Sequence, residues 1–517
     1  MKRIVFLTIA TLLVLGLVLT GCGETPVEEN LIKIAVVGPM TDLQGQNHWD
    51  GASMAAEEIN DAGGVDIGGT MYDVELVKVE TKESTEGETG DTGKANLNAV
   101  IDDVDFCVGG FRTEIVSVYR EVAMEAGVLF MNCGAATGSL QFTTVTNYAK
   151  YKYWFKSTPY NETFLVKSLL KMTGTIGAVL GGTLAGYDAA VKAEYKVGAP
   201  QTVPLRVVIL MENAAWCTGM VAAAQYYLPL MGYNVTHTIL VDPTATTIGV
   251  ANWNTIINDY PHIIFTAFSG SVGAVYSIER VANGVPAVTI GINVPGQQLS
   301  HWVNTGGDCE GEIMLDTWGV GMNNTPLTGA WFDAFVVRTG RYPVYTAATY
   351  DSIKAVCKGI DETNSVNSDV LIAWLENPDN AYTEGTGTTV TAYYQMPAIE
   401  ITPGELYALN ETQVREFYDI DSYGYTYNVN DWGCGFVTGV QQPHIAHDTV
   451  YGPGYQTGIG SQWQAPTGPG VKVGIWPMVV GSPILDQYGD WNFAYPGAED
   501  LALMIEGMLN IAWDPYA

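Results

Sequence analysis

The fold is decided by residues 32–64, which read IKIAVVGPMTDLQGQNHWDGASMAAEEINDAGG. The apolar run at 32–37 predicts a buried strand. The pattern at 50–61 predicts a helix that the following glycine pair ends. A strand, a loop and a helix in this order open a doubly wound α/β domain, in which small ligands bind beyond the carboxyl ends of the strands. We therefore expect the loop at residues 39–48 to face a ligand.

Strands and helices alternate along most of the chain. The predicted strands lie at 72–80, 105–109, 128–132, 206–211, 234–240, 262–267 and 287–292, and the predicted helices at 92–101, 114–125, 162–172, 218–231, 251–259 and 273–283. This alternation predicts parallel sheets. We expect two similar sheets, each completed by later segments, and an aromatic, irregular stretch at 142–156 between them.

The composition indicates a globular and acidic protein. A chain of 517 residues with 47% hydrophobic content can bury cores for two or three domains. Its 23 Lys and Arg residues stand against 55 Asp and Glu residues, which gives a net charge of −32. Because phosphate binding needs clustered basic side chains, no nucleic-acid partner is expected. We interpret the acidity as a device for solubility rather than as a functional patch.

The first residues predict export. A basic pair and the apolar run at 4–19 have the charged and apolar regions of an export signal, and the run is short for a membrane span. Residues 19–22, LTGC, resemble a bacterial-type lipobox, in which Cys22 becomes the lipidated first residue; a plain signal peptide or an anchor helix is the alternative. The predicted signal peptide is then 1–21 and the tether 22–31. We expect the protein to lie outside the cytoplasmic membrane, at the cell surface or in the periplasm, held by lipid.

Six further cysteines permit disulfides without indicating any pairing. They are far apart and form no CxxC pair, so a zinc site is not expected. We interpret Cys107 and Cys133, on or beside predicted core strands, as buried small hydrophobic residues. His444 and His447, with Asp448, lie in a turn-rich segment where we favour a structural hairpin over a metal site. No metal and no cofactor are therefore predicted.

The opening stretch resembles the Leu/Ile/Val-binding, or branched-chain amino acid, family of extracytoplasmic solute receptors that feed ABC importers. The matching pieces are Gly38-Pro39-Met40-Thr41, Gly51-Ala52 and Glu58-Ile59-Asn60 before the glycine pair, with further likeness at 312–318, 327–343, 350–359, 447–455, 462–463 and 471–477. The resemblance implies a type I periplasmic-binding-protein fold. In this fold two doubly wound lobes with parallel-rich sheets are joined by a multi-strand hinge, and the ligand lies between them.

The resemblance also divides the chain into parts. The predicted parts are the first part of the N-lobe at 32–157, the first part of the C-lobe at 158–317, a return to the N-lobe at 318–378, and a C-lobe elaboration with C-terminal hairpins at 379–517. The likeness fades over 377–430, for which little order is predicted.

On the N-lobe side, two turns are implied to hold the ligand's carboxylate. Thr113 stands at the main hydroxyl position of the first turn, although simple helix capping would also explain a threonine there. Arg112 departs from the family's usual small residue. In the second turn, Ala135 would offer its backbone and Thr137 its hydroxyl; an ordinary turn is the alternative. Helix N-termini near such turns favour anions.

On the C-lobe side, the resemblance implies three more ligand contacts. Trp216 would cover the ligand with apolar area, unless it is a core residue. Ser269 follows another strand in a turn that faces the ligand. Asn293 stands where amino-acid receptors often carry an acid for the ligand's ammonium, and this weakens the assignment to amino acids.

The sequence therefore predicts a lipid-anchored solute receptor that closes on a small ligand and presents it to an ABC permease. The expected ligand is an amino acid, with an amide or an aromatic or aliphatic carboxylate as the alternative. A sensory or adhesive lipoprotein with the same fold is a second class. An enzyme such as a hydrolase is the least favoured, because no GxSxG elbow, HExxH helix or GxGxxG after a strand is present.

Overall fold

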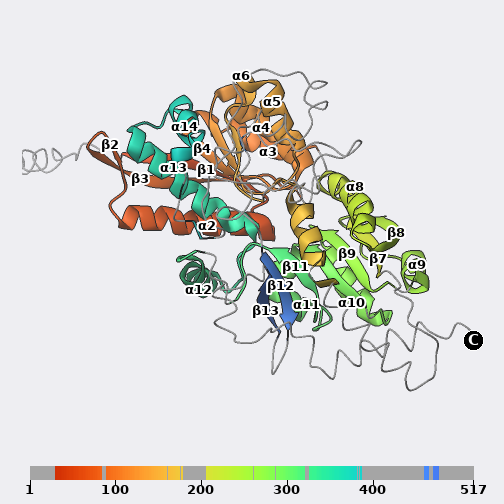
Figure 1. Ribbon diagram of the computed structural model, residues 1–517. Coiled ribbons are helices and arrows are strands. Elements are labelled where there is room, and N and C mark those ends of the chain that lie inside the picture. The colour runs from red at the N-terminus through yellow and green to blue at the C-terminus, as the bar shows by residue number, and fades with distance from the viewer. Residues whose placement is uncertain are drawn as a thin grey trace, which may run out of the picture.

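Two mixed α/β lobes lie side by side in the computed structural model (Figure 1). The structure describes residues 30–83, 89–159, 161–162, 164–174, 176–177, 205–259, 261–285, 287–320, 325–380, 382, 385–386, 447, 459–464 and 470–476. The leader, the tether, Cys22 and nearly all of 377–430 beyond Asn380 lie outside these residues. The predicted fold class, two doubly wound lobes with parallel-rich sheets, is confirmed.

The N-lobe is built on a six-stranded sheet in the order β2-β3-β1-β4-β5-β6. Its strands are β1 (Leu31–Gly38), β2 (Val65–Ile67), β3 (Thr70–Glu80), β4 (Phe106–Gly109), β5 (Leu129–Asn132) and β6 (Trp154–Lys156). All neighbours are parallel except the short hairpin of β2 and β3. Strand β1 lies centrally with both faces covered, which explains its almost unbroken apolar sequence.

The C-lobe is built on a seven-stranded sheet in the order β13-β12-β11-β10-β9-β7-β8. Its strands are β7 (Arg206–Glu212), β8 (Asn234–Val241), β9 (Ile263–Phe268), β10 (Val288–Asn293), β11 (Ile313–Asp316), β12 (Ile459–Gln464) and β13 (Val471–Trp476). The first five are parallel, and β12 and β13 extend the sheet as an antiparallel pair. A segment from near the end of the chain therefore completes this lobe.

Helices cover both sheets and define the two ends of the cleft. They are α2 (Leu43–Asp61), α3 (Asp91–Asn98), α4 (Thr113–Ala126), α5 (Ser139–Thr146), α6 (Tyr148–Tyr151), α8 (Ala215–Leu230), α9 (Val250–Asp259), α10 (Val272–Ala282), α11 (Ser300–Asn304), α12 (Thr328–Thr339), α13 (Thr349–Thr363) and α14 (Ser368–Leu375), with 3₁₀ turns η1 (Ile101–Asp103), η2 (Pro295–Gln297), η3 (Tyr345–Ala348) and η4 (Pro378–Asn380). Helical residues 164–174 also pack into the C-lobe core.

The two lobes share one apolar cluster near their junction. Helices α2, α13 and α14 pack there with Trp331 and Phe335 of α12, and Trp318 and Trp463 lie in the same cluster. The Trp463 indole donates to the carbonyl of Gly296 at 2.8 Å.

The segment that returns after β11 brings helices to the N-lobe rather than strands. Among the described residues, the N-lobe sheet contains no strand from beyond β6. The expectation that later segments complete both sheets is wrong for the strands described here.

Helix α2 begins at Leu43, not near residue 50, so the predicted loop at 39–48 is largely helix. The sequence from 43 to 50 is polar, which hid its helical character. Those polar side chains are held by distant backbone: Asn47 Oδ1 accepts from Val344 N at 3.0 Å, and His48 Nδ1 lies 3.0 Å from the carbonyl of Thr346. Tertiary hydrogen bonds thus override a weak local pattern.

The stretch at 142–156 is more regular than expected, because it contains parts of α5, α6 and β6. Strand β6 pairs with β5 in parallel and ends the N-lobe sheet. The predicted division into parts stays a prediction. Of its last part, Thr386 and His447 lie on the N-lobe: Thr386 N donates to Asp351 Oδ1 at 3.0 Å, and the carbonyl of His447 accepts from Lys156 N at 2.9 Å.

Five of the six cysteines that follow Cys22 are described, and all five are buried and free. Cys107 and Cys133 are both fully buried, as expected of small hydrophobic residues on core strands. Burial raises the pKa of the Cys133 thiol to about 12. Cys434 lies outside the described residues.

Candidate ligand site

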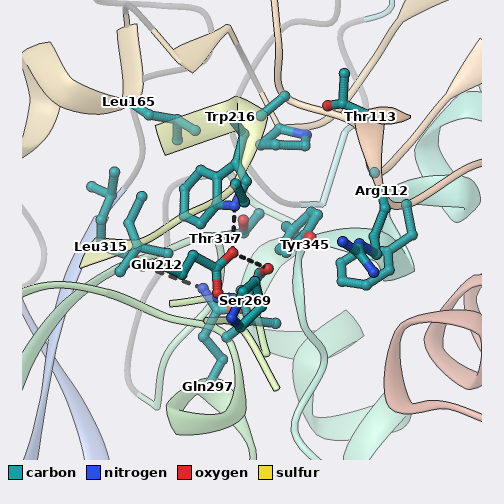
Figure 2. A pocket seen from close by; sticks show the side chains of 18 of the residues that line it. Arg112, Thr113, Leu165, Glu212, Trp216, Ser269, Gln297, Leu315, Thr317 and Tyr345 are labelled. Atoms are coloured by element: carbon teal, nitrogen blue, oxygen red, sulfur yellow. Dashed lines mark hydrogen bonds between the residues drawn. The ribbon is translucent and has the colours of Figure 1, made fainter. Parts of the chain in front are cut away.

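A cavity lies between the two lobes at the carboxyl ends of their strands (Figure 2). The cavity has a volume of about 70 Å³, which is room for a small molecule. Its lining residues are Phe111, Arg112, Thr113, Glu114, Gly134, Ala136 and Pro159 from the N-lobe side, Leu165, Glu212, Ala214, Trp216, Pro243, Ser269, Ile292, Val294, Gln297, Leu315, Asp316 and Thr317 from the C-lobe side, and Tyr345 of η3. Apolar side chains form most of the wall, and the polar groups gather at its two ends.

The N-lobe end is the first turn of helix α4. Gly109 and Gly110 adopt positive φ angles of 125° and 94°, and this turn after β4 aims the helix at the cavity. Thr113 is the first helical residue, and its Oγ1 lies 2.9 Å from Thr137 Oγ1. The N-cap position belongs to Arg112, so capping does not occupy the Thr113 hydroxyl. The first N–H groups of a helix have no partner inside it and favour an acceptor or an anion.

Ala135 is not brought to the cavity. The side chain of Asn132 accepts from its N–H at 3.1 Å and donates to its carbonyl at 2.8 Å, so both backbone groups are already used. Gly134 and Ala136 line the cavity in its place. The turn that the family likeness indicated thus lies at the cavity, but through residues one step to either side of Ala135, a difference that sequence spacing does not reveal.

Arg112 lies at the edge of the cavity and is anchored by Glu83. Its backbone N–H donates to Glu83 Oε2 at 2.5 Å, and Tyr119 and Thr81 donate to the other carboxylate oxygen at 3.1 and 2.8 Å. Glu83 is fully buried, and burial raises its pKa to about 7, against the lowering effect of these hydrogen bonds. The guanidinium of Arg112 remains at the edge of the cavity (Figure 2).

The C-lobe end is organised by Glu212, which sequence reasoning missed. It is the last residue of β7 and is fully buried. Its Oε1 accepts from the Trp216 indole at 2.6 Å and from the Ser269 hydroxyl, while its Oε2 accepts from the backbone N–H groups of Ser269 at 2.8 Å and Gly270 at 3.2 Å. Burial raises the pKa of Glu212, and the four donors oppose that shift. Glu212 thereby fixes both Trp216 and Ser269 at the cavity wall (Figure 2).

Asn293 does not reach the cavity either. It is buried at the end of β10, where its Nδ2 donates to the carbonyl of Gly273 at 3.2 Å and its Oδ1 accepts from Gly296 N at 3.2 Å. Its neighbours Ile292 and Val294 line the cavity. Because side chains alternate along a strand, this one-residue offset turns Asn293 away from the cleft. An acid does line the C-lobe side of the cavity, but it comes from a different strand, as Glu212 of β7.

A buried ion pair forms part of the cavity floor. The Asp316 carboxylate pairs with Lys472 of β13, and both side chains are buried. Lys472 Nζ also donates to the carbonyl of Gln297 at 2.8 Å. The antiparallel strands at the sheet edge therefore hold two residues of the floor in place.

One hydrogen bond crosses from lobe to lobe beside the cavity. The Glu114 carboxylate, on α4 of the N-lobe, accepts from the N–H of Ala215 at 3.0 Å. Ala215 is the first residue of α8 in the C-lobe, and the N-cap Ala214 has no side chain that could serve. The N-lobe thus caps a C-lobe helix, which is possible only while the lobes are together.

A wider groove of about 540 Å³ adjoins the cavity. Phe111, Arg112, Pro243 and Ser269 line both spaces, so the groove continues the cleft outward. Of the segment predicted to face a ligand, Leu43, Gln44 and Gln46 line this outer groove rather than the cavity.

Fold and cavity together define a bilobed protein that encloses small molecules in a cleft. The family model for periplasmic binding proteins matches residues 31–392, and the chain belongs to that family. Membership implies an extracytoplasmic location. The resemblance inferred from the opening stretch is thereby confirmed.

Solved structures with the same fold share little sequence with this chain. The branched-chain amino acid transporter substrate-binding protein LivJ from Streptococcus pneumoniae, in complex with isoleucine, has a TM-score of 0.54 at 17% identity over 70% of this chain and 92% of that one. A solute-binding protein of an ABC transporter from Rhodopseudomonas palustris, in complex with p-hydroxybenzoic acid, has a TM-score of 0.54 at 17% identity. The match covers 70% of this chain and 88% of that one. A putative branched-chain amino acid ABC transporter from Silicibacter pomeroyi has a TM-score of 0.54 at 15% identity. The match covers 86% of this chain and 96% of that one. No curated protein matches the chain.

Neither a membrane span nor a metal centre occurs in the part of the chain that the structure describes. No helix there is long and apolar enough to cross a bilayer, and no three His, Cys, Asp or Glu side chains gather as metal ligands. His447 instead stacks on Phe155 with ring centroids 3.9 Å apart, and its Nε2 lies 2.6 Å from Glu376 Oε1. Its possible partners His444 and Asp448 lie outside the described residues.

Proposed function

We propose that this protein is the lipid-anchored solute receptor of an ABC importer and that it carries a small amino-acid-like ligand between its lobes. The observation that carries the proposal is the polarity of the cavity. The first turn of α4 with Thr113 lies at one end, and the buried Glu212 carboxylate lies at the other. Binding stabilises the closed form, because a ligand touches both lobes only there.

The two ends suit opposite charges. A carboxylate head accepts hydrogen bonds from the helix N-terminus and from the Thr113 hydroxyl. An ammonium is attracted to the C-lobe end, where four donors favour the ionised form of Glu212 against the effect of its burial. Between these ends, Trp216, Leu165 and Ile292 provide apolar cover. Branched-chain and related amino acids therefore come first as ligands.

Amides and aromatic or aliphatic acids are the second ligand class. The solved structures of the same fold include proteins in complex with isoleucine and with p-hydroxybenzoic acid, so the fold accommodates both chemistries. The same apolar wall would accept a flat ring against Trp216. This class lacks an ammonium for the Glu212 end, which is why it ranks second.

A catalytic role is disfavoured by the chemistry of the wall. Neither a histidine nor a cysteine is among the described residues that line the cavity, and the Glu212 carboxyl that accepts from the Ser269 hydroxyl also accepts three other hydrogen bonds. A sensory or adhesive lipoprotein with the same lobes remains the alternative class. It would differ in lacking a transported ligand.

The proposal is tested by thermal denaturation with a panel of amino acids, amides and small carboxylates, followed by recovery of the ligand. A true ligand raises the melting temperature by mass action and is recovered unchanged. A chemically converted ligand would show turnover and contradict the receptor function. No response to the whole panel would favour the sensory or adhesive class.

A further inference from the structure

From an unpaired acceptor in the cavity floor, we infer that Gln297 selects ligands that carry a hydrogen-bond donor. Gln297 is the last residue of η2, lines the cavity and is only 3% exposed. Its Nε2 donates to the carbonyl of Leu315 at 3.2 Å, but its Oε1 has no donor in the part of the chain that the structure describes. The inference rests on the proposed function and deepens it.

Among the described residues around it, none donates to this oxygen. The backbone of Gln297 is fixed, because its N–H donates to the carbonyl of Val294 at 3.1 Å and its carbonyl accepts from Lys472 Nζ at 2.8 Å. With the Nε2–Leu315 bond, these contacts hold the side-chain amide in one position. A buried acceptor that lacks a donor is unfavourable, and native proteins rarely retain one without a ligand, an ion or a water to fill it.

The two acids near Gln297, Glu212 and Asp316, already accept hydrogen bonds from protein donors. Glu212 accepts four hydrogen bonds, which is about the full capacity of a carboxylate. Asp316 accepts from Lys472, from Ser461 Oγ at 3.1 Å and from Thr317 N at 2.8 Å. Glu212 therefore has little hydrogen-bonding capacity left for a ligand, whereas Gln297 Oε1 is the buried acceptor in the floor that lacks a donor among the described residues.

A donor group at the C-lobe end of the ligand fits this arrangement. Figure 2 shows Gln297 rising from the floor toward Glu212, so a group that reaches the amide oxygen also lies in the field of that carboxylate. An ammonium satisfies both demands, and a hydroxyl satisfies only the hydrogen bond. Acids that end in a purely apolar group satisfy neither, and they leave Gln297 Oε1 buried and unpaired.

The inference is tested by calorimetry with two pairs of probes that differ in one donor. The first pair is leucine and 4-methylpentanoate, and the second is 4-hydroxybenzoate and benzoate. In the unaltered protein, the donor-bearing member of at least one pair should bind ten-fold or more tightly than its partner. A polar site rejects an analogue that leaves its buried group unpaired. Equal affinity within every pair that binds would overturn the role of Gln297 while leaving the receptor function intact.

Two variants separate the effect of Gln297 on ligand selectivity from any effect on the stability of the protein. Gln297→Met keeps about the length and volume of the side chain but removes the acceptor, together with the Nε2 donor to Leu315, and it should reduce the ratio within a pair toward one. Gln462→Met is the matched control, because Gln462 is also 3% exposed and its Nε2 donates to the carbonyl of Gly311 at 3.2 Å, while the residue lines neither the cavity nor the outer groove. The control should keep the parental ratio.

An unchanged ratio in Gln297→Met would overturn the inference, as would an equal loss in Gln462→Met. If none of the four probes binds the unaltered protein, the proposed ligand class fails and the inference fails with it. Melting temperatures without ligand are measured for both variants, and the affinity ratio within a pair is insensitive to any loss of folded protein.

Discussion

At the scale of single residues, Glu212 matters most because it combines burial, charge and position. It ends a buried strand at the point where α/β lobes bind ligands, and it fixes Trp216 and Ser269 by direct hydrogen bonds. The sequence carried a usable signal, namely an acid directly after the apolar run of 206–211. The family likeness indicated a different position, that of Asn293, for contact with the ammonium of a ligand.

Glu83 predicts a specific dependence of stability on pH. Its pKa is about 7 in the folded protein against an ordinary value of 4.5, so its contribution to stability is fully present below about pH 4.5 and is lost as the pH rises through 7. Glu83→Gln removes this titration. Between pH 8 and pH 5, the parent should gain roughly 2 to 3 kcal/mol in free energy of unfolding relative to Glu83→Gln, as judged by urea denaturation at both pH values.

Comparing parent with variant matters here, because other buried groups titrate in the same range. Burial lowers the pKa of His48 to about 4, and that of His301 likewise, so these histidines cost stability as the pH falls. They are common to both proteins and cancel in the difference. A difference that stays constant from pH 8 to pH 5 would show that Glu83 does not titrate in this window.

Thr113→Ala tests the N-lobe end of the cavity. The change removes a hydroxyl that faces the cavity and leaves the Thr137 hydroxyl without its partner at 2.9 Å. Ligand binding should weaken by about 1 to 3 kcal/mol, the range for an unsatisfied buried polar group. Calorimetry on a ligand that raises the melting temperature measures the effect, and Thr113→Ser, which keeps the hydroxyl, should bind nearly like the parent. Parental affinity in Thr113→Ala would remove this residue from the site.

At the scale of elements, the contact between α4 and α8 predicts a latch that works only in the closed form. Glu114→Ala removes the cap on Ala215 without touching either lobe's core. Affinity for ligand should fall by about 0.5 to 2 kcal/mol, the usual worth of a helix cap, while the melting temperature without ligand stays close to the parent's. Glu114→Gln retains an acceptor oxygen and should recover most of the loss. Equal weakening in both variants would assign the effect to charge instead of to the cap.

Most elements could be predicted from sequence, because buried parallel strands read as short apolar runs and their helices as amphipathic segments. Strands β7, β9 and β10 and helices α4, α9 and α10 differ from their predicted bounds by one or two residues at most. The start of α2 could not be predicted, since its polar side chains are satisfied by backbone hundreds of residues away.

The site was harder to predict than the fold. Thr113, Trp216 and Ser269, which the family likeness indicated, do line the cavity. Ala135 and Asn293 miss it by a single residue, a precision that depends on local backbone bonds to Asn132 and Gly296 rather than on spacing. Gln297 had no signal in sequence, since its open oxygen exists only through the packing of Leu315 and Lys472 around it.

At the scale of the whole molecule, the proposed anchor makes a prediction about location. Cys22→Ser removes the residue that a lipobox would lipidate. The variant should leave the membrane fraction or accumulate as an unprocessed precursor, as judged by fractionation and electrophoretic mobility of the protein made in a bacterial host. A second cysteine change, Cys107→Ser, serves as a control, because that residue is buried in the N-lobe core. If Cys22→Ser fractionates and migrates like the parent, the prediction of a lipid anchor at Cys22 is wrong.

The central claim is that a small ligand is held unchanged between two lobes that close on it. Small-angle X-ray scattering of the protein with and without a saturating ligand from the panel tests this claim most directly. We predict that the ligand decreases the radius of gyration, and that Glu114→Ala shows the same decrease at a higher ligand concentration. A scattering profile that does not change when the ligand is shown by calorimetry to be bound would contradict closure of the cleft.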